Sequence, residues 1–265
     1  MKRLFGVVEA SLLAARALGL RAVAREAWRR LARVPYTYRG VEVADSETFR
    51  VLRLLAARGE VWGDGEHVYF RTSYGVFSAP RGWLHLLQPL AAEDFEAMYG
   101  FLDVRGRVVA DVGAYIGETA VLFAKRGARR VVAYEPVFWR LLERNVQLNQ
   151  LSDVVEVRRH GVWLENATLY TMNAGTATGL VDGLLPIEVR RADFWGAHVV
   201  KMDCEGCEWL LATSDCGTLK TVQEYVVEIH GPEPYIVSKM RRCGFAARRL
   251  NWPSEPMLSL WHFYL

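Results

Sequence analysis

The chain is short of cysteine, of long apolar runs and of net charge, and each shortage excludes a class of protein. Four cysteines in 265 residues do not make the disulfide framework of a small secreted domain, so we expect reduced thiols and a cytoplasmic protein. Near the N-terminus the apolar stretches are interrupted by Glu9, Arg16 and Arg21. None approaches the roughly eighteen uninterrupted apolar residues of a membrane span, which predicts a soluble protein.

The net charge is only +3 and is unevenly distributed along the chain. Residues 1–33 carry eight Lys or Arg against two Glu, a net of +6, so the remaining chain carries −3. A protein that binds nucleic acid over its main body is usually basic there, so any contact with a polyanion is expected at the N-terminal arm, and nucleic acid is not the favoured partner. Hydrophobic residues make up 51% of the chain, enough for a substantial core.

The first 90 residues predict an N-terminal helical and hairpin extension. Residues 4–33 have helical spacing of apolar positions, and Gly19 marks a break between two helices. We interpret them as ordinary helices with solvated arginines; the alternative is a basic arm for an anionic membrane surface, RNA or a protein partner. Short Tyr, Val and Phe runs at 67–72 and 74–78 indicate a hairpin.

Residues 91–265 predict an α/β domain, because short buried strands alternate with helical stretches. The expected strands are 107–112, 130–134, 154–158, 198–203 and 222–230. Helices are expected from about 117 to 126, after the second strand through about 149, from about 205 to 212 and from about 235 to 243. An inserted hairpin is expected at 168–190, and residues 245–250 and 257–264 are expected to form a terminal hairpin. Five β/α steps that end in a hairpin are typical of a nucleotide-binding sheet whose last strand is antiparallel.

The loop after the first strand of this domain carries the most informative residues. Gly113 and Gly117 permit a tight turn and close approach of a ligand to backbone amides. A dinucleotide fold would place glycines where this chain has Tyr115 and Glu118. The carboxylates of Asp111 and Glu118 would also repel a pyrophosphate by about 1–4 kcal/mol. A ligand with adenosine, no phosphate and a positive charge fits better, and S-adenosylmethionine is such a ligand.

An acid for the ribose stands at the end of the second strand. Glu135 lies 22 residues after Gly113, and its two oxygens can accept both ribose hydroxyls. Hydrogen bonds to a charged acceptor contribute about 1.5–3 kcal/mol, so replacing Glu135 should weaken cofactor binding by about tenfold or more.

Four segments together resemble the FkbM-type S-adenosylmethionine-dependent methyltransferases: 109–120, 132–136, 200–211 and 226–230. The resemblance covers about residues 95–250, and the family usually has Asn in place of Tyr115. It implies a class I methyltransferase (Rossmann-like) fold, with a mostly parallel seven-stranded sheet and an antiparallel last strand. It also implies O-methylation, often on sugar or secondary-metabolite hydroxyls. The predicted cofactor-binding residues are Asp111, Gly113, Ala114, Tyr115, Gly117, Thr119, Glu135, Pro136, Gly161 and Val162.

Candidate catalytic residues end the fourth and fifth strands of the domain, where ligands of open α/β sheets bind. Asp203 ends one strand, and Glu228 with His230 ends the next. His230 is the predicted base, because its ordinary pKa lies near 6.5, and either acid could orient it or place the substrate. Otherwise His230 is simply a histidine hydrogen-bonded to a loop. We expect Glu205 to cap the following helix and Glu208 to pair along it.

The cysteine pair Cys204 and Cys207 raises the question of a metal, but the sequence has no second pair of zinc ligands at familiar spacing. A divalent ion is chemically compatible with Asp203, Glu228 and His230, yet nothing in the sequence demands one, and we predict no metal. The prediction is thus an S-adenosylmethionine-dependent methyltransferase acting on a hydroxyl of a small molecule or glycan.

Three alternatives stay open. An RNA methyltransferase would use the basic N-terminal arm for its substrate. A non-catalytic S-adenosylmethionine-binding or membrane-surface adaptor would bind without transferring a methyl group, although the acids and histidine at the strand ends speak against it. An NAD-linked oxidoreductase is disfavoured by the acidic glycine loop.

Overall fold

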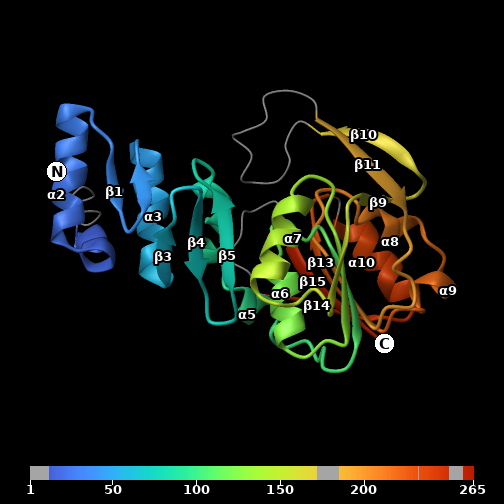
Figure 1. Ribbon diagram of the computed structural model, residues 1–265. Coiled ribbons are helices and arrows are strands. Elements are labelled where there is room, and N and C mark those ends of the chain that lie inside the picture. Colours follow the sequence, from blue (N-terminus) through green and yellow to red (C-terminus); the bar gives the residue numbers. More distant parts are fainter. Residues whose placement is uncertain (1–11, 172–184, 232, 251–258) are drawn as a thin grey trace. The chain divides into compact units, whose positions relative to one another are not determined.

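A computed structural model describes residues 12–171, 185–231, 233–250 and 259–265 (Figure 1). The chain divides into two compact units, Met1–Asp94 and Phe95–Leu265. Within the described ranges, no helix combines the length and the apolar character that a bilayer crossing requires.

The N-terminal unit is built from helices and two small antiparallel sheets. Residues 12–18 are helical, and Gly19, with a φ of 85°, separates them from α2 (Leu20–Ala32), which confirms the predicted break. The elements that follow are β1 (Tyr36–Tyr38), β2 (Val41–Val43), α3 (Ser46–Arg58), β3 (Glu60–Gly63), β4 (His67–Arg71), β5 (Val76–Pro80), the 3-10 helix η1 (Leu84–Leu87) and α4 (Pro89–Ala92). β1 pairs with β2, and β4 lies between β3 and β5. The pairing of β4 with β5 confirms the predicted hairpin.

Helix α2 buries charged side chains and exposes large apolar ones, the reverse of an ordinary surface helix. Its buried side contains Glu26 and Arg29, whose side chains form two hydrogen bonds of 2.8 Å. Leu20, Trp28 and Leu31 are 78%, 66% and 81% exposed. The helix therefore turns an ion pair inward and large apolar side chains outward.

The second unit contains a seven-stranded sheet with the order β14-β15-β13-β12-β6-β7-β8. The strands are β6 (Val108–Val112), β7 (Arg130–Tyr134), β8 (Val155–Arg158), β12 (Val199–Met202), β13 (Glu224–Ile229), β14 (Ala246–Arg249) and β15 (Ser259–Tyr264). β15 runs antiparallel to both of its neighbours, and the pairs from β13 to β8 are parallel. This arrangement confirms the predicted class I methyltransferase sheet and its terminal hairpin.

Helices lie on both faces of this sheet. α6 and α7 lie on one side of it, and α8 and α10 lie on the other (Figure 1). The helices of the unit are α5 (Phe95–Tyr99), α6 (Glu118–Lys125), α7 (Trp139–Leu148), α8 (Trp209–Thr213), α9 (Cys216–Leu219) and α10 (Glu233–Arg242). The helix expected from residue 205 begins only at Trp209, because Glu205 and Gly206 have φ angles of 56° and 121° and form a turn.

A separate three-stranded sheet contains β9 (Gly161–Trp163), β10 (Ala167–Thr171) and β11 (Leu185–Arg191). β10 and β11 pair antiparallel, which confirms the predicted inserted hairpin, and β9 pairs parallel with β11. The middle of the insert, residues 172–184, and the link of the terminal hairpin, residues 251–258, lie outside the described residues.

The expectation of reduced thiols is wrong in this structure. Cys204 is joined to Cys207 and Cys216 to Cys243 by disulfide bonds, with Cα atoms 5.5 Å and 5.1 Å apart, within the range that disulfides require. The second pair is 27 residues apart in sequence. Cys216 begins α9 and Cys243 directly follows α10, and no local spacing pattern in the sequence predicts their contact.

Candidate functional site

Strand register places the predicted catalytic positions at one edge of the sheet. Val112 pairs with Met202, and Met202 pairs with Val227. The next residues of the last two strands are Asp203 and Glu228, which therefore emerge side by side at the carboxyl ends. All of β12 is buried, so polar side chains just beyond its end are candidates for a functional role.

The glycine loop after β6 meets the same edge. Gly113 has a φ of 78°, and a Cβ atom on it would overlap the carbonyl oxygen of Asp203, so only glycine fits. The amides of Gly113 and Ala114 donate to the carbonyl oxygen of Tyr134 at 3.0 Å and 3.1 Å. Gly117, with a φ of 103°, is the N-cap of α6. The loop is thus fixed between the ends of β7 and β12.

Glu135 follows β7 and is buried, and three backbone amides already bind its carboxylate. Tyr115 N donates to Oε2 at 2.9 Å, and the amides of Val137 and Phe138 donate to Oε1 at 2.7 Å and 2.9 Å. Burial raises the pKa of Glu135 and these three donors oppose the rise. A carboxylate accepts about four hydrogen bonds, so two ribose hydroxyls can bind only if one amide gives way.

The Tyr115 side chain lies against this carboxylate region. Its ring packs edge-on against Phe138, with centroids 5.0 Å apart, and its φ is 47°. Its hydroxyl is buried and, among the described residues, has no hydrogen-bond partner. An unsatisfied buried hydroxyl costs about 1–3 kcal/mol, a cost that a bound ligand with a polar group would remove.

Asp111 and Thr119 have internal partners. Thr119 Oγ1 donates to Asp111 Oδ2 at 2.6 Å, and Lys201 Nζ lies 3.2 Å from Asp111 Oδ1. Lys201 also donates to the carbonyl oxygen of Gly113 at 2.6 Å. Burial lowers the pKa of Lys201, but Asp111 and Asp203 raise it more, so the ammonium offsets part of the negative charge of this loop.

Lys201 was missed by sequence reasoning, although a signal was present. It is the one charged residue of β12, a strand that is otherwise apolar and fully buried. A buried ammonium group is costly unless a carboxylate pairs with it, and the strand register places Asp111 directly opposite Lys201.

The remaining predicted cofactor residues are Pro136, which follows Glu135 after β7, and Gly161 and Val162, which begin β9. A Cβ atom built on Gly161 would stand 3.7 Å from Pro136, so the structure brings these two positions together. Val162 is 3% exposed and belongs to the hydrophobic core, so its side chain has a packing role.

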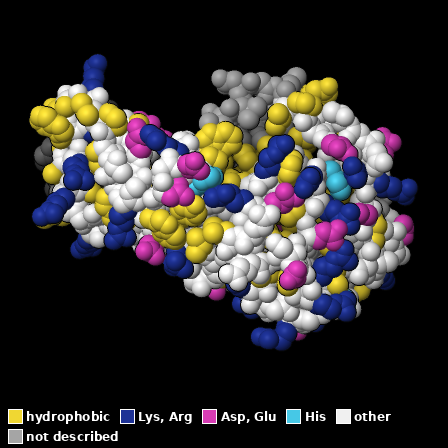
Figure 2. All heavy atoms as spheres, in the orientation of Figure 1, with side chains coloured by type: hydrophobic (Ala, Val, Ile, Leu, Met, Phe, Trp, Pro, Cys, Tyr) yellow, Lys and Arg dark blue, Asp and Glu magenta, His cyan; other side chains and the backbone are white. Residues whose placement is uncertain are grey.

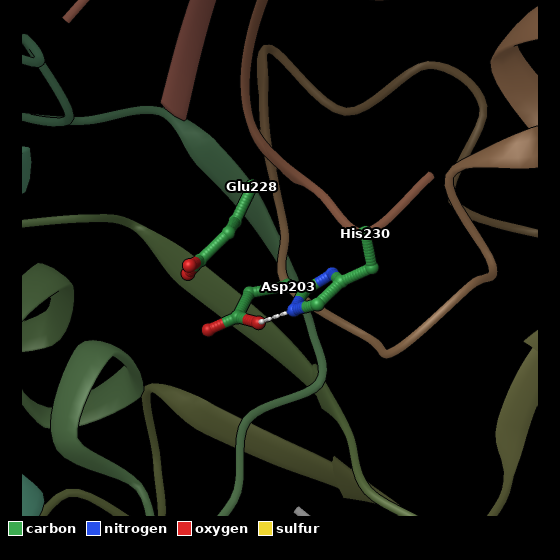
Figure 3. A group of neighbouring side chains, drawn as sticks. All are labelled: Asp203, Glu228 and His230. Carbon is green, nitrogen blue, oxygen red and sulfur yellow. Dashed lines mark ion pairs between the residues drawn. The ribbon is translucent and has the colours of Figure 1, made fainter. Parts of the chain in front are cut away.

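Asp203, Glu228 and His230 come together at the carboxyl edge, as Figure 3 shows. One ligand-type atom from each lies within 4.8 Å of the others. His230 Nε2 is 3.8 Å from Asp203 Oδ1 and 3.7 Å from Glu205 Oε2. The structure thus gathers the three residues that the sequence placed on two separate strand ends.

Glu208 is a further member of this site that sequence reasoning did not assign. Its buried Oε1 lies 3.0 Å from His230 Nδ1 and accepts the amides of Cys204 and Gly206 at 3.3 Å and 3.4 Å. The expected roles of Glu205 as a helix cap and Glu208 as a helix-surface pair are therefore wrong. Both lie in the turn before α8 and face the imidazole.

This environment changes the charge of His230. Burial lowers its pKa, but the hydrogen bond to Glu208 and the charges of Asp203 and Glu205 raise it more, to about 9. The neighbouring carboxylates therefore favour the protonated imidazole when no other cation lies beside them. The predicted base role assumed the ordinary value near 6.5, and these surroundings do not favour the proton-accepting form.

A surface hollow of about 410 Å³ lies at the opposite edge of the sheet, where β6, β7 and β8 begin. An ion pair between Arg130 and Glu156 occupies part of its lining. The hollow is therefore separate from the carboxyl edge.

Comparisons with known proteins give distant likenesses. No family model matches the chain. The uncharacterized protein 158B of Sulfolobus islandicus rod-shaped virus 1 is 23% identical over 146 residues, which cover 52% of this chain and 69% of that protein.

Two solved structures illustrate the structural likeness. The methyltransferase FkbM of Methylobacillus flagellatus KT is 16% identical with a TM-score of 0.45, covering 68% of this chain and 55% of its own. Streptococcus pneumoniae Sp1610, solved with S-adenosyl-L-methionine, is 15% identical with a TM-score of 0.43, covering 64% of this chain and 70% of its own. Likenesses at this level identify neither a family nor a substrate.

Proposed function

We propose that the protein is an S-adenosylmethionine-dependent methyltransferase that acts on a hydroxyl of a small molecule or glycan. The observation that carries the proposal is the buried carboxylate of Glu135, which follows β7 beside the glycine loop after β6 within a class I methyltransferase sheet. Ligands of open α/β sheets bind at this edge.

The residues of the edge fit the cofactor. Glu135 can accept a ribose hydroxyl, and the buried Tyr115 hydroxyl lacks a partner among the described residues, which a polar group of the ligand would supply. Carboxylates at the edge, above all Asp203, favour a sulfonium and an ammonium group and disfavour a diphosphate.

The chain's own residues would position the reaction. Bound S-adenosylmethionine supplies an electrophilic methyl group. Alignment of the acceptor oxygen with that group contributes up to about 7–11 kcal/mol, and Asp203 and Glu228 stand where they can hold a hydroxyl by hydrogen bonds. The hydroxyl proton passes to a carboxylate of this pair and then to solvent, and the imidazolium of His230 fixes Asp203 in place.

Calorimetric titration with S-adenosylmethionine, S-adenosylhomocysteine and NAD, side by side, tests the cofactor. We expect both sulfur ligands to bind one per chain and NAD to give no heat. The substrate class is tested by transfer of a labelled methyl group to hydroxyl-bearing small molecules, glycans and RNA. Tight NAD binding without a response to the sulfur ligands overturns the assignment, and methylated RNA overturns the acceptor class.

We also propose that α2 binds an anionic membrane surface. Besides its exposed apolar residues, the helix carries the exposed Arg21, and the exposed Arg33 is its C-cap. Its single acid, Glu26, is buried and paired. Figure 2 shows hydrophobic side chains gathered next to Lys and Arg side chains over this helix. Insertion of an exposed Trp or Leu side chain stabilises binding by about 1.5–3 kcal/mol, and each arginine adds about 1 kcal/mol at an anionic surface.

Vesicle sedimentation tests this surface. We expect binding to vesicles with phosphatidylglycerol, weak binding to pure phosphatidylcholine, and a loss of about tenfold or more in Trp28→Ala. Trp83→Ala, which removes another exposed tryptophan of the same unit, is the matched control and should bind normally. Equal binding by the two variants, or a dimer that buries α2 instead, contradicts the proposal.

A further inference from the structure

The cluster at the ends of β12 and β13 has the composition of a cation site. Asp203 directly follows β12, and Glu228 lies near the end of the neighbouring strand β13, one residue beyond the Met202–Val227 pair. His230 lies two residues after Glu228, so both project to the same side of the chain. Figure 3 shows the carboxylates and the imidazole converging from the two strand ends. Two carboxylates with one imidazole are ligands that suit divalent cations.

The spacing of the three side chains also fits a shared ion. Their ligand atoms lie within 4.8 Å of one another. Two ligands of one divalent ion, each about 2.0–2.4 Å from it, lie at most about 4–5 Å apart. Small side-chain rotations therefore suffice to bring all three atoms onto one ion.

Outside these three residues, Glu208 holds the imidazole as metal-binding histidines are usually held. Its carboxylate lies 3.0 Å from His230 Nδ1 and is almost completely buried. With Nδ1–H donating to Glu208, a cation that displaces the Nε2 proton would find Nε2 facing Asp203 at 3.8 Å. Metal-ligating histidines commonly donate their second ring nitrogen to such a carboxylate.

The local charge favours a cation as well. Asp203, Glu205, Glu208 and Glu228 bring four carboxylates to this edge. Lys201, which lies 3.9 Å from Asp203, is shared with Asp111. An excess of partly buried negative charge is costly unless a positive group offsets it.

We propose that Asp203, Glu228 and His230 bind one divalent cation of the magnesium or manganese class. The cation would lower the pKa of an acceptor hydroxyl bound to it. The O–H proton would pass to solvent, and the oxygen's electron pair would form the O–CH3 bond as the S–CH3 bond of S-adenosylmethionine breaks and S-adenosylhomocysteine leaves. This role in the reaction rests on the proposed function, whereas the cation site itself does not.

Manganese titration of the intact chain tests the site. We expect one Mn²⁺ per chain, seen as loss of the free-ion electron paramagnetic resonance signal, with Mg²⁺ as a competitor. Asp203→Asn and Glu228→Gln should each weaken Mn²⁺ binding by about tenfold or more. Glu233→Gln, which removes a carboxylate of α10 outside the cluster, should leave it unchanged.

The thermal midpoint gives a second measurement, because an ion that binds only the folded chain raises it. Mn²⁺ should raise the midpoint of the unaltered chain and of Glu233→Gln more than that of the two cluster variants. No saturable binding, or equal binding by all four proteins, overturns the site. If Mn²⁺ binds as expected while S-adenosylmethionine does not, the cation site stands and the proposed function fails.

Discussion

Lys201→Met is the substitution whose effect the structure predicts most fully. Lys201 is 3% exposed and lies 3.2 Å from the carboxylate of Asp111, which is fully buried. Removing the ammonium leaves that carboxylate without its cation, which typically costs 3–5 kcal/mol for a buried pair. The hydrogen bond to the Gly113 carbonyl adds about 1 kcal/mol. We therefore expect the free energy of unfolding of the second unit to fall by about 4 kcal/mol or more.

A double variant separates the effect of the unpaired charge from the effect of lost packing. Asp111→Asn combined with Lys201→Met removes both charges, and the pair should recover about 2 kcal/mol relative to the single lysine variant. Urea unfolding followed by circular dichroism gives the free energies, and hydrogen exchange of the β6 and β12 peptides assigns the loss to this unit. A single variant that loses less than about 1 kcal/mol, or a double variant no more stable than the single one, refutes the reasoning.

Three further predictions follow from other parts of the structure. Gly113→Ala should abolish S-adenosylmethionine binding in calorimetry while the secondary structure survives, because the added methyl group would overlap the Asp203 carbonyl oxygen; normal binding would show that the loop has room. Glu26→Gln should lower the thermal midpoint at pH 7 by an amount that shrinks below about pH 4.5, because its arginine partners outweigh burial and depress the pKa of Glu26, so its stabilisation exists above that pH and is lost on acidification; a pH-independent difference would contradict this. Removing the bond between Cys216 and Cys243 with a Ser pair should cost about 3–4 kcal/mol by loop entropy, measured in urea without reductant, and an unchanged midpoint would show that the bond adds no stability.

The sheet was predictable because its strands are short, apolar and evenly spaced. Residues 130–134 were predicted as the second strand and form β7 without a shift. Gly117 marked the start of α6 because glycine there adopts a left-handed conformation that other residues disfavour. These features depend on residues close together in the chain, so a single sequence is sufficient to predict them.

The details of the site were less predictable because they depend on contacts between distant residues. The turn at Glu205 and Gly206 replaced an expected helix start, and this turn aims Glu208 at His230. The number of backbone amides that donate to Glu135 could not be predicted from the sequence either, because one of them belongs to Tyr115, twenty residues earlier. The hydrogen bond to Glu208 and the charges of Asp203 and Glu205, which come from the end of β12 and the turn after it, raise the pKa of His230, and sequence spacing alone does not reveal this.

A crystal structure of the chain soaked with S-adenosylhomocysteine tests the central claim most directly. We expect the ligand at the carboxyl ends of β6 and β7, with a ribose hydroxyl within hydrogen-bond distance of Glu135 and the thioether sulfur facing Asp203. Density for the ligand elsewhere, with all three amides still on the Glu135 carboxylate and no ribose beside it, would contradict the account.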